Sequence, residues 1–271
     1  MSKTSLAALI RSLQQDIART GGLLVAFSGG VDSAVVAALA RRALGARAVA
    51  LTIDSQTFTS EELRDARKLA RLIGIRHIVK KYDELGDRRF RANPPNRCYL
   101  CRKGMARELR ATARRLGIGA IADGANFSDI SEHRPGIRAA TEAGILHPLM
   151  EHGVGKEDIR RIARALKLPV HDRPSSACLS SRIPYGEEIT VPKLERIARA
   201  EAYLRKLGFR EVRVRSHGGL ARIEVDRKAI SRLTGKATSG KVAAYLRRLG
   251  FIYVTVDMAG YRSGSMDEAL Q

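Results

Sequence analysis

The sequence has only three cysteines and no apolar run long enough to cross a membrane. The apolar N-terminal segment LAALI is interrupted by Arg11 before it could form the core of a signal peptide. We therefore expect a cytoplasmic protein. An odd, small number of cysteines is a poor disulfide framework, so a metal site or reactive thiol chemistry is the better hypothesis for them.

Acidic residues are also scarce. The chain has 28 Asp and Glu against 49 Lys and Arg, which gives a formal net charge of +21. Such an excess of positive charge favours a nucleic-acid or phosphorylated partner. However, 37 of the 49 basic residues are arginines spread along helical segments of an alanine-rich chain. A solvated basic surface is therefore the favoured explanation of the charge, and a nucleic-acid partner is not expected.

Apolar runs alternate with helical patterns in the first part of the chain. The expected elements are strands over 22–27, 47–53, 75–80 and 118–123, with helices over 33–44, 60–73 and 102–116 between them. Short buried strands separated by helices predict an α/β, Rossmann-like fold in which helices cover both faces of a parallel sheet. Ligands of such sheets bind beyond the carboxyl ends of the strands.

The pattern changes after an irregular segment over 170–190 that is rich in proline and serine. Here the expected elements are helices over 192–207 and 238–249 and strands over 211–216, 220–226 and 251–257. The sequence His217-Gly218-Gly219 between two of these strands predicts a hairpin, and with it a smaller α+β domain. The expected domains are 1–185 and 186–271.

The stretch FSGGVDSA follows the first expected strand and opens the next helix. Gly29 and Gly30 would turn the chain so that successive amides point at an anion, supported by the helix dipole. Ser28 and Ser33 can add hydroxyl donors. The stretch has neither the Gly-Lys-Ser/Thr of a Walker motif nor the third glycine of a dinucleotide fingerprint. A phosphate-binding loop is predicted, and a Gly-Gly turn capped by Ser28 or Asp32 is the alternative.

Residues Ser28 to Ser33, placed after a first strand, resemble the pyrophosphate loop (PP-loop) of the N-type ATP pyrophosphatases. Members of this superfamily split ATP into AMP and pyrophosphate while adenylating a substrate oxygen. The resemblance covers roughly the N-terminal half of the chain and implies ATP and Mg²⁺ as cofactors. It also implies further nucleotide-binding residues near the strand ends, with Asp32 taking part in catalysis. These residues are Asp54, Ser55, Gly124 and Asp129. Turn formation or helix capping is the alternative for Asp54 and Asp129.

The three cysteines lie in two motifs. Cys98 and Cys101 belong to NRCYLCRK, which opens a helix, and Cys178 belongs to SSACLSSR. Neighbouring arginines and a helix N-terminus would favour the reactive thiolate form. A zinc site lacks an obvious fourth ligand, and a redox dithiol lacks the usual thioredoxin context. An iron–sulfur cluster with three thiolate ligands and one open iron position fits the number of cysteines.

Four segments together extend the resemblance over nearly the whole chain: NRCYLC, ACLSSRIPYGEEIT, RVRSHGGLARIEV and DMAGYRSGS. They are similar to the ATP-dependent sacrificial sulfur transferases (LarE) of nickel-pincer nucleotide biosynthesis, which serves lactate racemase maturation. The resemblance implies that pyridinium-3,5-biscarboxylic acid mononucleotide is adenylated on a carboxylate. Cys178 would then attack, and the sulfur would leave as a thiocarboxylate.

In the sacrificial type the attacking cysteine becomes dehydroalanine, whereas members that add a CxxC pair hold a [4Fe-4S] cluster carrying an extra sulfide. Because this chain has the pair, the favoured interpretation is a cluster held by Cys98, Cys101 and Cys178. Whether the sulfur comes from Cys178 or from a cluster-bound sulfide stays open.

The implied substrate carries a phosphate and carboxylates, which planar and permanently charged arginine side chains bind well. The expected substrate-binding residues lie in the family-like motifs: Ser180, Arg182, Arg213, Arg215, Arg222 and Arg262. Each arginine taken alone also fits a solvated surface. Four glutamates are candidates for a metal-binding or proton-transfer group, with no choice between them: Glu187, Glu188, Glu201 and Glu224.

Three alternatives remain open. A transfer-RNA thiolation enzyme with a three-cysteine [4Fe-4S] cluster would also explain the positive charge. A second alternative is an amide-forming synthetase that uses ammonia, but in such an enzyme the three cysteines would have no role. A non-enzymatic RNA-binding protein would hold structural zinc. The resemblance further implies a homo-oligomer and pathway partners that supply the dicarboxylate and insert nickel, without a membrane partner.

Overall fold

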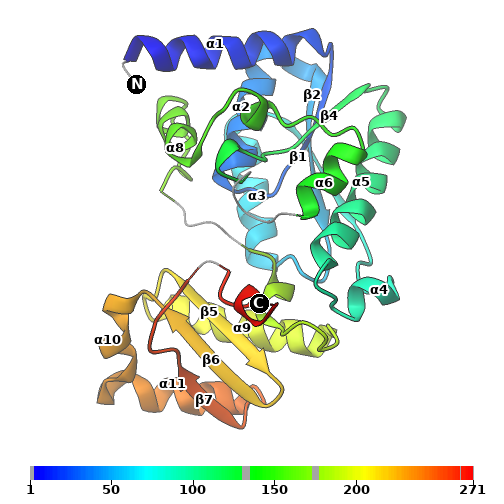
Figure 1. Cartoon of the computed structure of the whole chain (residues 1–271). Helices are drawn as coiled ribbons and strands as arrows, with labels where there is room; N and C mark the ends of the chain where they lie inside the picture. The colour runs from blue at the N-terminus through cyan, green and yellow to red at the C-terminus, as the bar shows by residue number, and fades with distance from the viewer. Residues whose placement is uncertain (1–2, 130–134, 173–176, 263, 271) are drawn as a thin grey trace. The chain divides into compact units, whose positions relative to one another are not determined.

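A computed structural model describes residues 3–129, 135–172, 177–262 and 264–270, which form two compact units (Figure 1). The first unit comprises Met1–Glu84 and Asn96–Ser176, and the second comprises Leu85–Pro95 and Ala177–Gln271. The short segment Leu85–Pro95 joins the second unit because its backbone pairs there. The Ile189 amide donates to the Arg91 carbonyl oxygen at 2.9 Å. The domain boundary after residue 185 stays a prediction.

A four-stranded parallel sheet forms the centre of the first unit. Its strands are β1 (Leu23–Ala26), β2 (Ala48–Asp54), β3 (Arg76–Lys81) and β4 (Ala120–Ala122), in the order β3-β2-β1-β4. The chain moves outward from β1 to β3 and then returns to the other side of β1. The carboxyl ends of β1 and β4 therefore flank a topological switch point, where ligands of such sheets bind. The predicted α/β fold is confirmed.

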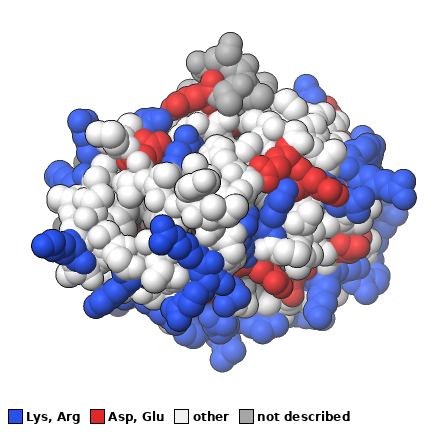
Figure 2. Space-filling model, turned by 90° about the horizontal axis from the view of Figure 1, so that it is seen from below, with Lys and Arg blue, Asp and Glu red and all other residues white. Residues whose placement is uncertain are grey.

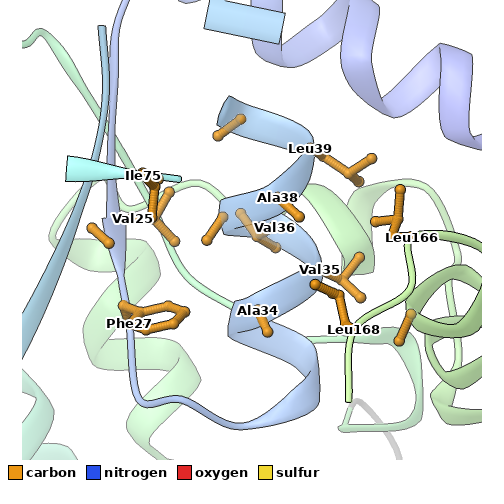
Figure 3. Packing of buried hydrophobic residues seen from close by; sticks show 14 of the residues in the cluster. Val25, Phe27, Ala34, Val35, Val36, Ala38, Leu39, Ile75, Leu166 and Leu168 are labelled. Atoms are coloured by element: carbon orange, nitrogen blue, oxygen red, sulfur yellow. The ribbon is translucent and has the colours of Figure 1, made fainter. Parts of the chain in front are cut away.

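Two apolar cores lie against the two faces of this sheet. One contains side chains of α1 (Lys3–Arg19), α2 (Val31–Leu44), α3 (Ser60–Ile73) and α8 (Lys156–Ala165). Figure 3 shows Val35 and Leu39 of α2 near Leu166 and Leu168, with Val25 of β1 in the same cluster. The other core contains side chains of α5 (Arg97–Arg115) and α6 (Pro135–Glu142). Because both faces are covered, the strands are rich in apolar residues on both sides.

The second unit is built on a mixed three-stranded sheet, β5-β6-β7. Strands β5 (Val212–His217) and β6 (Leu220–Val225) form the predicted antiparallel hairpin, and β7 (Tyr253–Val256) pairs parallel to β6. Helices α9 (Val191–Lys206) and α11 (Lys236–Arg248) contribute to its apolar core with α10 (Ile230–Thr234). The structure confirms that this smaller part of the chain has the predicted α+β fold class.

The remaining elements are short. They are η1 (Gly45–Arg47), α4 (Arg88–Arg91), η2 (Phe127–Asp129), α7 (Pro148–Glu151), η3 (Leu179–Arg182), η4 (Arg227–Ala229) and η5 (Asp267–Leu270). Sequence periodicity did not predict α4, α6, α7 or α10. The helix expected over 102–116 begins at Arg97, so both cysteines of the CxxC pair are helical. Among the described residues, no helix combines the length and apolar character that crossing a membrane requires.

Candidate nucleotide and sulfur-transfer sites

The loop between β1 and α2 is braced by its own two serine hydroxyls. Ser33 Oγ lies 3.1 Å from Ser28 Oγ and accepts from the Ser28 amide at 3.3 Å. The Gly30 amide donates to Ser28 Oγ at 3.3 Å. Gly30 itself is extended, with φ −75°, and is the N-cap of α2. The loop is thus held closed at the positive end of a helix, which is the arrangement that binds anions.

Two glycines allow close backbone approaches at this loop. Gly29 has φ +77°, and a Cβ on it would lie 3.0 Å from the Ala66 Cα of α3. Gly124 follows β4, and a Cβ there would lie 2.6 Å from the Ser33 amide nitrogen. A side chain at position 124 would clash with backbone atoms, which cannot shift without a large energetic cost. The absence of a side chain at the predicted residue Gly124 therefore lets the end of β4 pack directly against the PP-loop.

Lys156 places a cation beside the loop. Its Nζ donates to Asp32 Oδ2 at 2.7 Å, and its backbone amide, in the first turn of α8, donates to Ser128 Oγ at 3.2 Å. The two charged side chains are partly exposed, Lys156 at 36% and Asp32 at 25%. This contact was not predictable, because a lone lysine 124 residues from its partner forms no sequence pattern.

The predicted adenosine residues after β2 differ in their surroundings. Asp54 ends the strand and is half-buried. Ser55 Oγ donates to Glu84 Oε2 at 3.1 Å, and Thr57 Oγ1 donates to the same oxygen at 2.6 Å. Glu84 is only 1% exposed. Ser55 therefore holds the loop in shape. Nucleotide contacts by Asp54 and Ser55 stay predictions.

Asp129 closes a turn after β4. Its Oδ2 accepts from the Asn126 amide at 3.1 Å and from Asn126 Nδ2 at 2.8 Å, and the side chain is buried. These contacts support the turn-forming alternative for Asp129. A nucleotide contact by this residue stays a prediction.

Asp123, in the stretch that follows β4, is a buried carboxylate. Asp123 Oδ1 is 2.8 Å from His147 Nδ1, and His147 Nε2 is 2.9 Å from Thr141 Oγ1. Arg102 NH2 of α5 lies 3.7 Å from Asp123 Oδ2. Burial raises the pKa of Asp123, but the His147 hydrogen bond and the Arg102 charge outweigh it and leave the pKa below its ordinary value. An ionised Asp123 therefore ties the CxxC helix to the end of β4.

The CxxC pair lies in the first turns of α5. Cys98 is exposed and Cys101 is half-buried, and neither is in a disulfide. Residues three apart on a helix share a face, so the two sulfurs could hold two positions of a metal or cluster. Between these cysteines, Tyr99 donates to Glu142 Oε2 of α6 at 2.5 Å. Within the described ranges, no three or more Cys, His, Asp or Glu residues are assembled as a metal site.

Cys178 is exposed and precedes η3 in the second unit. Its Sγ lies 2.6 Å from the hydroxyl of the buried Ser180. Arg182, which is 3% exposed, donates from Nε to Glu201 Oε1 at 2.8 Å, and the same oxygen accepts the Val214 amide at 3.1 Å. A buried ion pair therefore anchors the cysteine segment to α9, and Glu201 in turn accepts a hydrogen bond from β5.

Three of the other predicted substrate arginines, Arg215, Arg222 and Arg262, pair with carboxylates of their own unit. Arg215 donates to the fully buried Glu224 at 2.7 Å, and Arg222 donates to the other oxygen of Glu224 at 3.2 Å. Burial and the nearby Arg182 charge lower the pKa of Arg213, whose guanidinium lies 4.8 Å from the Tyr261 ring. The Arg262 guanidinium also pairs, through contacts with Asp257 at 3.5 Å and Glu268 at 3.2 Å.

The four candidate glutamates are therefore ion-pair partners. Glu201 and Glu224 pair with buried arginines, as described above. Glu187 lies 2.9 Å from Lys193 Nζ, and Glu188 lies 3.0 Å from Arg91 Nε. None of these four contacts points to a metal ligand or a proton-transfer group.

The basic residues are distributed rather than concentrated on the face seen in Figure 2. There, Lys and Arg side chains occur at many separate places, with Asp and Glu between them and wide uncharged areas. This pattern on one face is typical of a solvated surface and resembles no continuous track for a nucleic-acid backbone.

Comparisons with known proteins agree with this geometry. A family profile described as thiamine biosynthesis protein (ThiI) matches residues 19–201. The chain is 43% identical over 265 residues to the uncharacterized protein slr1717 of Synechocystis, covering 98% of this chain and 99% of that protein. It is 36% identical over 269 residues to pyridinium-3,5-bisthiocarboxylic acid mononucleotide synthase of Lactiplantibacillus plantarum, covering 99% and 94%.

A further match is partial. The tRNA-specific 2-thiouridylase MnmA of Methylobacterium nodulans is 30% identical over 196 residues, which cover 57% of this chain and 50% of that protein. This similarity therefore covers only about half of each protein.

The parallel sheet, its switch point and the serine-braced glycine loop define a PP-loop protein that uses ATP. Within that superfamily the chain belongs to the LarE family of sulfur transferases, to which it is related over nearly its whole length. The chain is accordingly an ATP-dependent sulfur-transferring enzyme.

Proposed function

We propose that this enzyme adenylates a carboxylate of pyridinium-3,5-biscarboxylic acid mononucleotide with ATP and converts it to a thiocarboxylate for the nickel-pincer nucleotide. One observation carries the proposal: the chain combines a closed PP-loop at the switch point of the sheet with an exposed Cys178 set in a cluster of arginines. The full-length similarity to a synthase named for the corresponding bisthiocarboxylic acid supports the choice of substrate.

The first step is adenylation. A substrate carboxylate oxygen attacks the α-phosphorus of ATP, the α–β phosphoanhydride bond breaks, and pyrophosphate leaves. The amides that open α2 and the Lys156 ammonium are suited to hold the pyrophosphate. Mg²⁺ would offset the triphosphate charge, and the partly exposed Asp32 carboxylate is an oxygen ligand of the kind that it prefers.

The second step transfers sulfur. The Cys178 thiolate attacks the acyl carbon, the bond to the AMP oxygen breaks, and a thioester forms. Contact with the Ser180 hydroxyl at 2.6 Å would stabilise negative charge on Sγ. Where Cys178 itself supplies the sulfur, release of a thiocarboxylate requires its Cβ–Sγ bond to break, whereas a cluster-bound sulfide would leave Cys178 intact.

Substrate recognition falls to the arginines of the second unit. Arg213, Arg215, Arg222 and Arg262 offer fixed charges for the phosphate and the second carboxylate. We propose that substrate anions compete with the present carboxylate partners of Arg215, Arg222 and Arg262. Arg182 is different, because both edges of its guanidinium are already used within the protein.

The sequence also predicts a resident [4Fe-4S] cluster. Three reduced cysteines supply thiolates of the right kind and number, and two of them share one face of α5. Cys98, Cys101 and Cys178 would be the ligands, and a bound cluster would supply an open iron site and an exchangeable sulfide. Iron and acid-labile sulfide analysis of anaerobically purified protein tests this. About four irons per chain support the cluster, and iron-free but active protein refutes it.

The experiment that tests the proposed function is substrate-dependent AMP formation. Purified enzyme with Mg²⁺ and ATP should release AMP and pyrophosphate when the dicarboxylate mononucleotide is added, and the product should carry sulfur in place of a carboxylate oxygen. AMP formation that depends on tRNA and ignores the mononucleotide would instead support the thiolation alternative. A homo-oligomer and the nickel-pathway partners stay predictions.

A further inference from the structure

The segment Gly264–Leu270, which we call the strap, lies against two of the arginines proposed to bind the substrate. Arg215 NH2 donates to Ser265 Oγ at 3.1 Å, and Arg222 NH2 donates to Met266 Sδ at 3.6 Å. Ser265 is 5% exposed and Met266 is 8% exposed. Arg215 is itself only 5% exposed. The strap therefore covers part of the surface through which a substrate anion would reach these two side chains.

Both NH2 groups are fully used while the strap is in place. Arg215 NH2 also donates to Glu224 Oε2 at 2.7 Å, and Arg222 NH2 also donates to Glu224 Oε1 at 3.2 Å. An arginine NH2 has two N–H bonds, so one is directed to Glu224 and the other to the strap. Removal of the strap would free one donor on each arginine without leaving the buried Glu224 unpaired. A substrate can thus gain these two donors before it has to compete with Glu224.

The same two arginines carry buried donors that the strap leaves unsatisfied. Arg215 and Arg222 are directly opposite each other in the pairing of β5 with β6, so their side chains share a face of the sheet. The Nε of each is buried and makes no hydrogen bond to any residue that the structure describes, although Asp257 Oδ2 lies 3.8 Å from Arg222 Nε. An unsatisfied buried donor costs free energy. A phosphate or carboxylate that bridges the two guanidinium groups would remove this cost.

We infer that the strap is a cover that the substrate displaces from Arg215 and Arg222, so that this segment sets the affinity of the substrate site. The inference rests on the proposed function. In the closed state the Ser265 hydroxyl and the Met266 sulfur take N–H bonds that substrate oxygens take in the open state. The bound anion also satisfies the two Nε donors, which favours the open state only when substrate is present.

The outer part of the strap is held by two exposed contacts. Tyr185 donates to Asp267 Oδ1 at 2.6 Å. Arg262, another of the proposed substrate arginines, donates to both carboxylate oxygens of Glu268 at 3.2 Å. Asp267 and Glu268 are exposed, so water competes for these hydrogen bonds and each contributes little to stability. A segment fastened in this way can open locally without unfolding the unit beneath it.

Two variants loosen the strap without changing an arginine. Tyr185→Phe removes the hydroxyl that donates to Asp267 and keeps the aromatic ring, so it should shift the strap toward the open state. Asp267→Asn weakens the same contact from the other side, because a neutral amide oxygen accepts less strongly than a carboxylate. The matched control is Tyr253→Phe, which removes the hydroxyl of a tyrosine in β7 that is 64% exposed.

The first measurement is the rate of methionine oxidation by dilute hydrogen peroxide, followed by peptide mapping. Met258 is 88% exposed and serves as the internal reference for Met266. In wild type without ligand, Met266 should oxidise more slowly than Met258, and saturating dicarboxylate mononucleotide should raise the Met266 rate. Tyr185→Phe and Asp267→Asn should raise it without ligand, by about 3–10-fold for the loss of one hydrogen bond, and Tyr253→Phe should not.

The second measurement is substrate-dependent AMP formation at varied mononucleotide concentration. Because only the open state binds substrate, the apparent dissociation constant increases as the open fraction decreases. Tyr185→Phe should therefore lower the KM for the mononucleotide by about 3–10-fold and leave kcat at the wild-type value. Tyr253→Phe should change neither. A KM for Tyr185→Phe equal to or above that of wild type would contradict the inference.

The strap and the proposed function fail differently. Substrate-dependent AMP formation together with a Met266 oxidation rate that ignores the mononucleotide would overturn the strap, while the proposed function stands. Absence of substrate-dependent AMP would overturn the proposed function. The Met266 rates of wild type and Tyr185→Phe without ligand would then still decide whether Asp267 holds the strap closed.

Discussion

Lys156 and Asp32 meet at 2.7 Å although 124 residues separate them in the chain. The contact joins the start of α8 to the PP-loop and sets a lysine ammonium beside the proposed pyrophosphate site. A lysine in this position can exchange its carboxylate partner for a phosphate oxygen when ATP binds.

Replacing Lys156 should therefore impair adenylation. We expect Lys156→Met to slow substrate-dependent AMP formation about 10–100-fold, equivalent to about 1.4–2.7 kcal/mol. The matched control is Lys80→Met, which breaks the 2.7 Å pair with Glu108, a contact of similar exposure. Equal AMP formation rates for the two variants would remove Lys156 from the pyrophosphate site.

The contact between Gly124 and the PP-loop should be intolerant of a methyl group. Gly124→Ala would set a Cβ 2.6 Å from the Ser33 amide nitrogen, so we expect a loss of about 1–3 kcal/mol of unfolding free energy together with weaker ATP binding. Gly119→Ala is the control, because a Cβ there meets no heavy atom within 4 Å. Urea denaturation and ATP titration of both variants check the prediction, which is wrong if Gly124→Ala binds ATP normally.

The buried pair of Arg215 and Glu224 should be costly to break. Arg215→Met would leave Glu224, which is 0% exposed, without its nearest cation, and we expect unfolding free energy to fall by about 3 kcal/mol. Arg89→Met, which removes the exposed partner of Asp87, should cost far less because solvent screens this pair. Similar losses in thermal and urea unfolding for both variants would contradict the prediction.

His77 should make stability depend on pH. Burial and the Arg67 charge lower the pKa of His77 from 6.5, so the folded protein disfavours its protonation. The stabilising contribution is complete above pH 6.5 and is lost as the pH falls through the folded-state pKa. Since Thr52 Oγ1 contacts both His77 and the Phe27 carbonyl oxygen, this loss adjoins the PP-loop.

The measurement is the unfolding free energy of wild type and His77→Gln between about pH 7.5 and about pH 5. Wild type should lose more stability than the variant over this range. Parallel curves for wild type and His77→Gln would show that His77 does not contribute.

The sequence predicted the sheet, its parallel strands and the hairpin, because each depends on local periodicity and on turn residues. It placed the start of the CxxC helix at 102 instead of Arg97, since no apolar repeat marks the first turns of a helix that follows Pro94 and Pro95. The four-residue helices α4 and α7 are too short to show a period.

Candidate site residues were predictable from the sequence only where they belong to a recognisable sequence motif. The PP-loop serines, Gly124 and Cys178 stand in recognisable stretches, whereas the Lys156–Asp32 and Asp123–His147 contacts arise from tertiary packing. The partner of Arg182 was equally hidden. A guanidinium in a substrate motif looks available for ligand binding, but once buried it needs a carboxylate, and Glu201 supplies it.

The central claim is that sulfur reaches the substrate through Cys178. The most direct test compares wild type with Cys178→Ala in ATP, Mg²⁺ and the dicarboxylate mononucleotide, measuring AMP and the product mass together. The account predicts that the variant still forms AMP but yields no thiocarboxylate, while wild type yields both. Thiocarboxylate formed by Cys178→Ala would contradict the account.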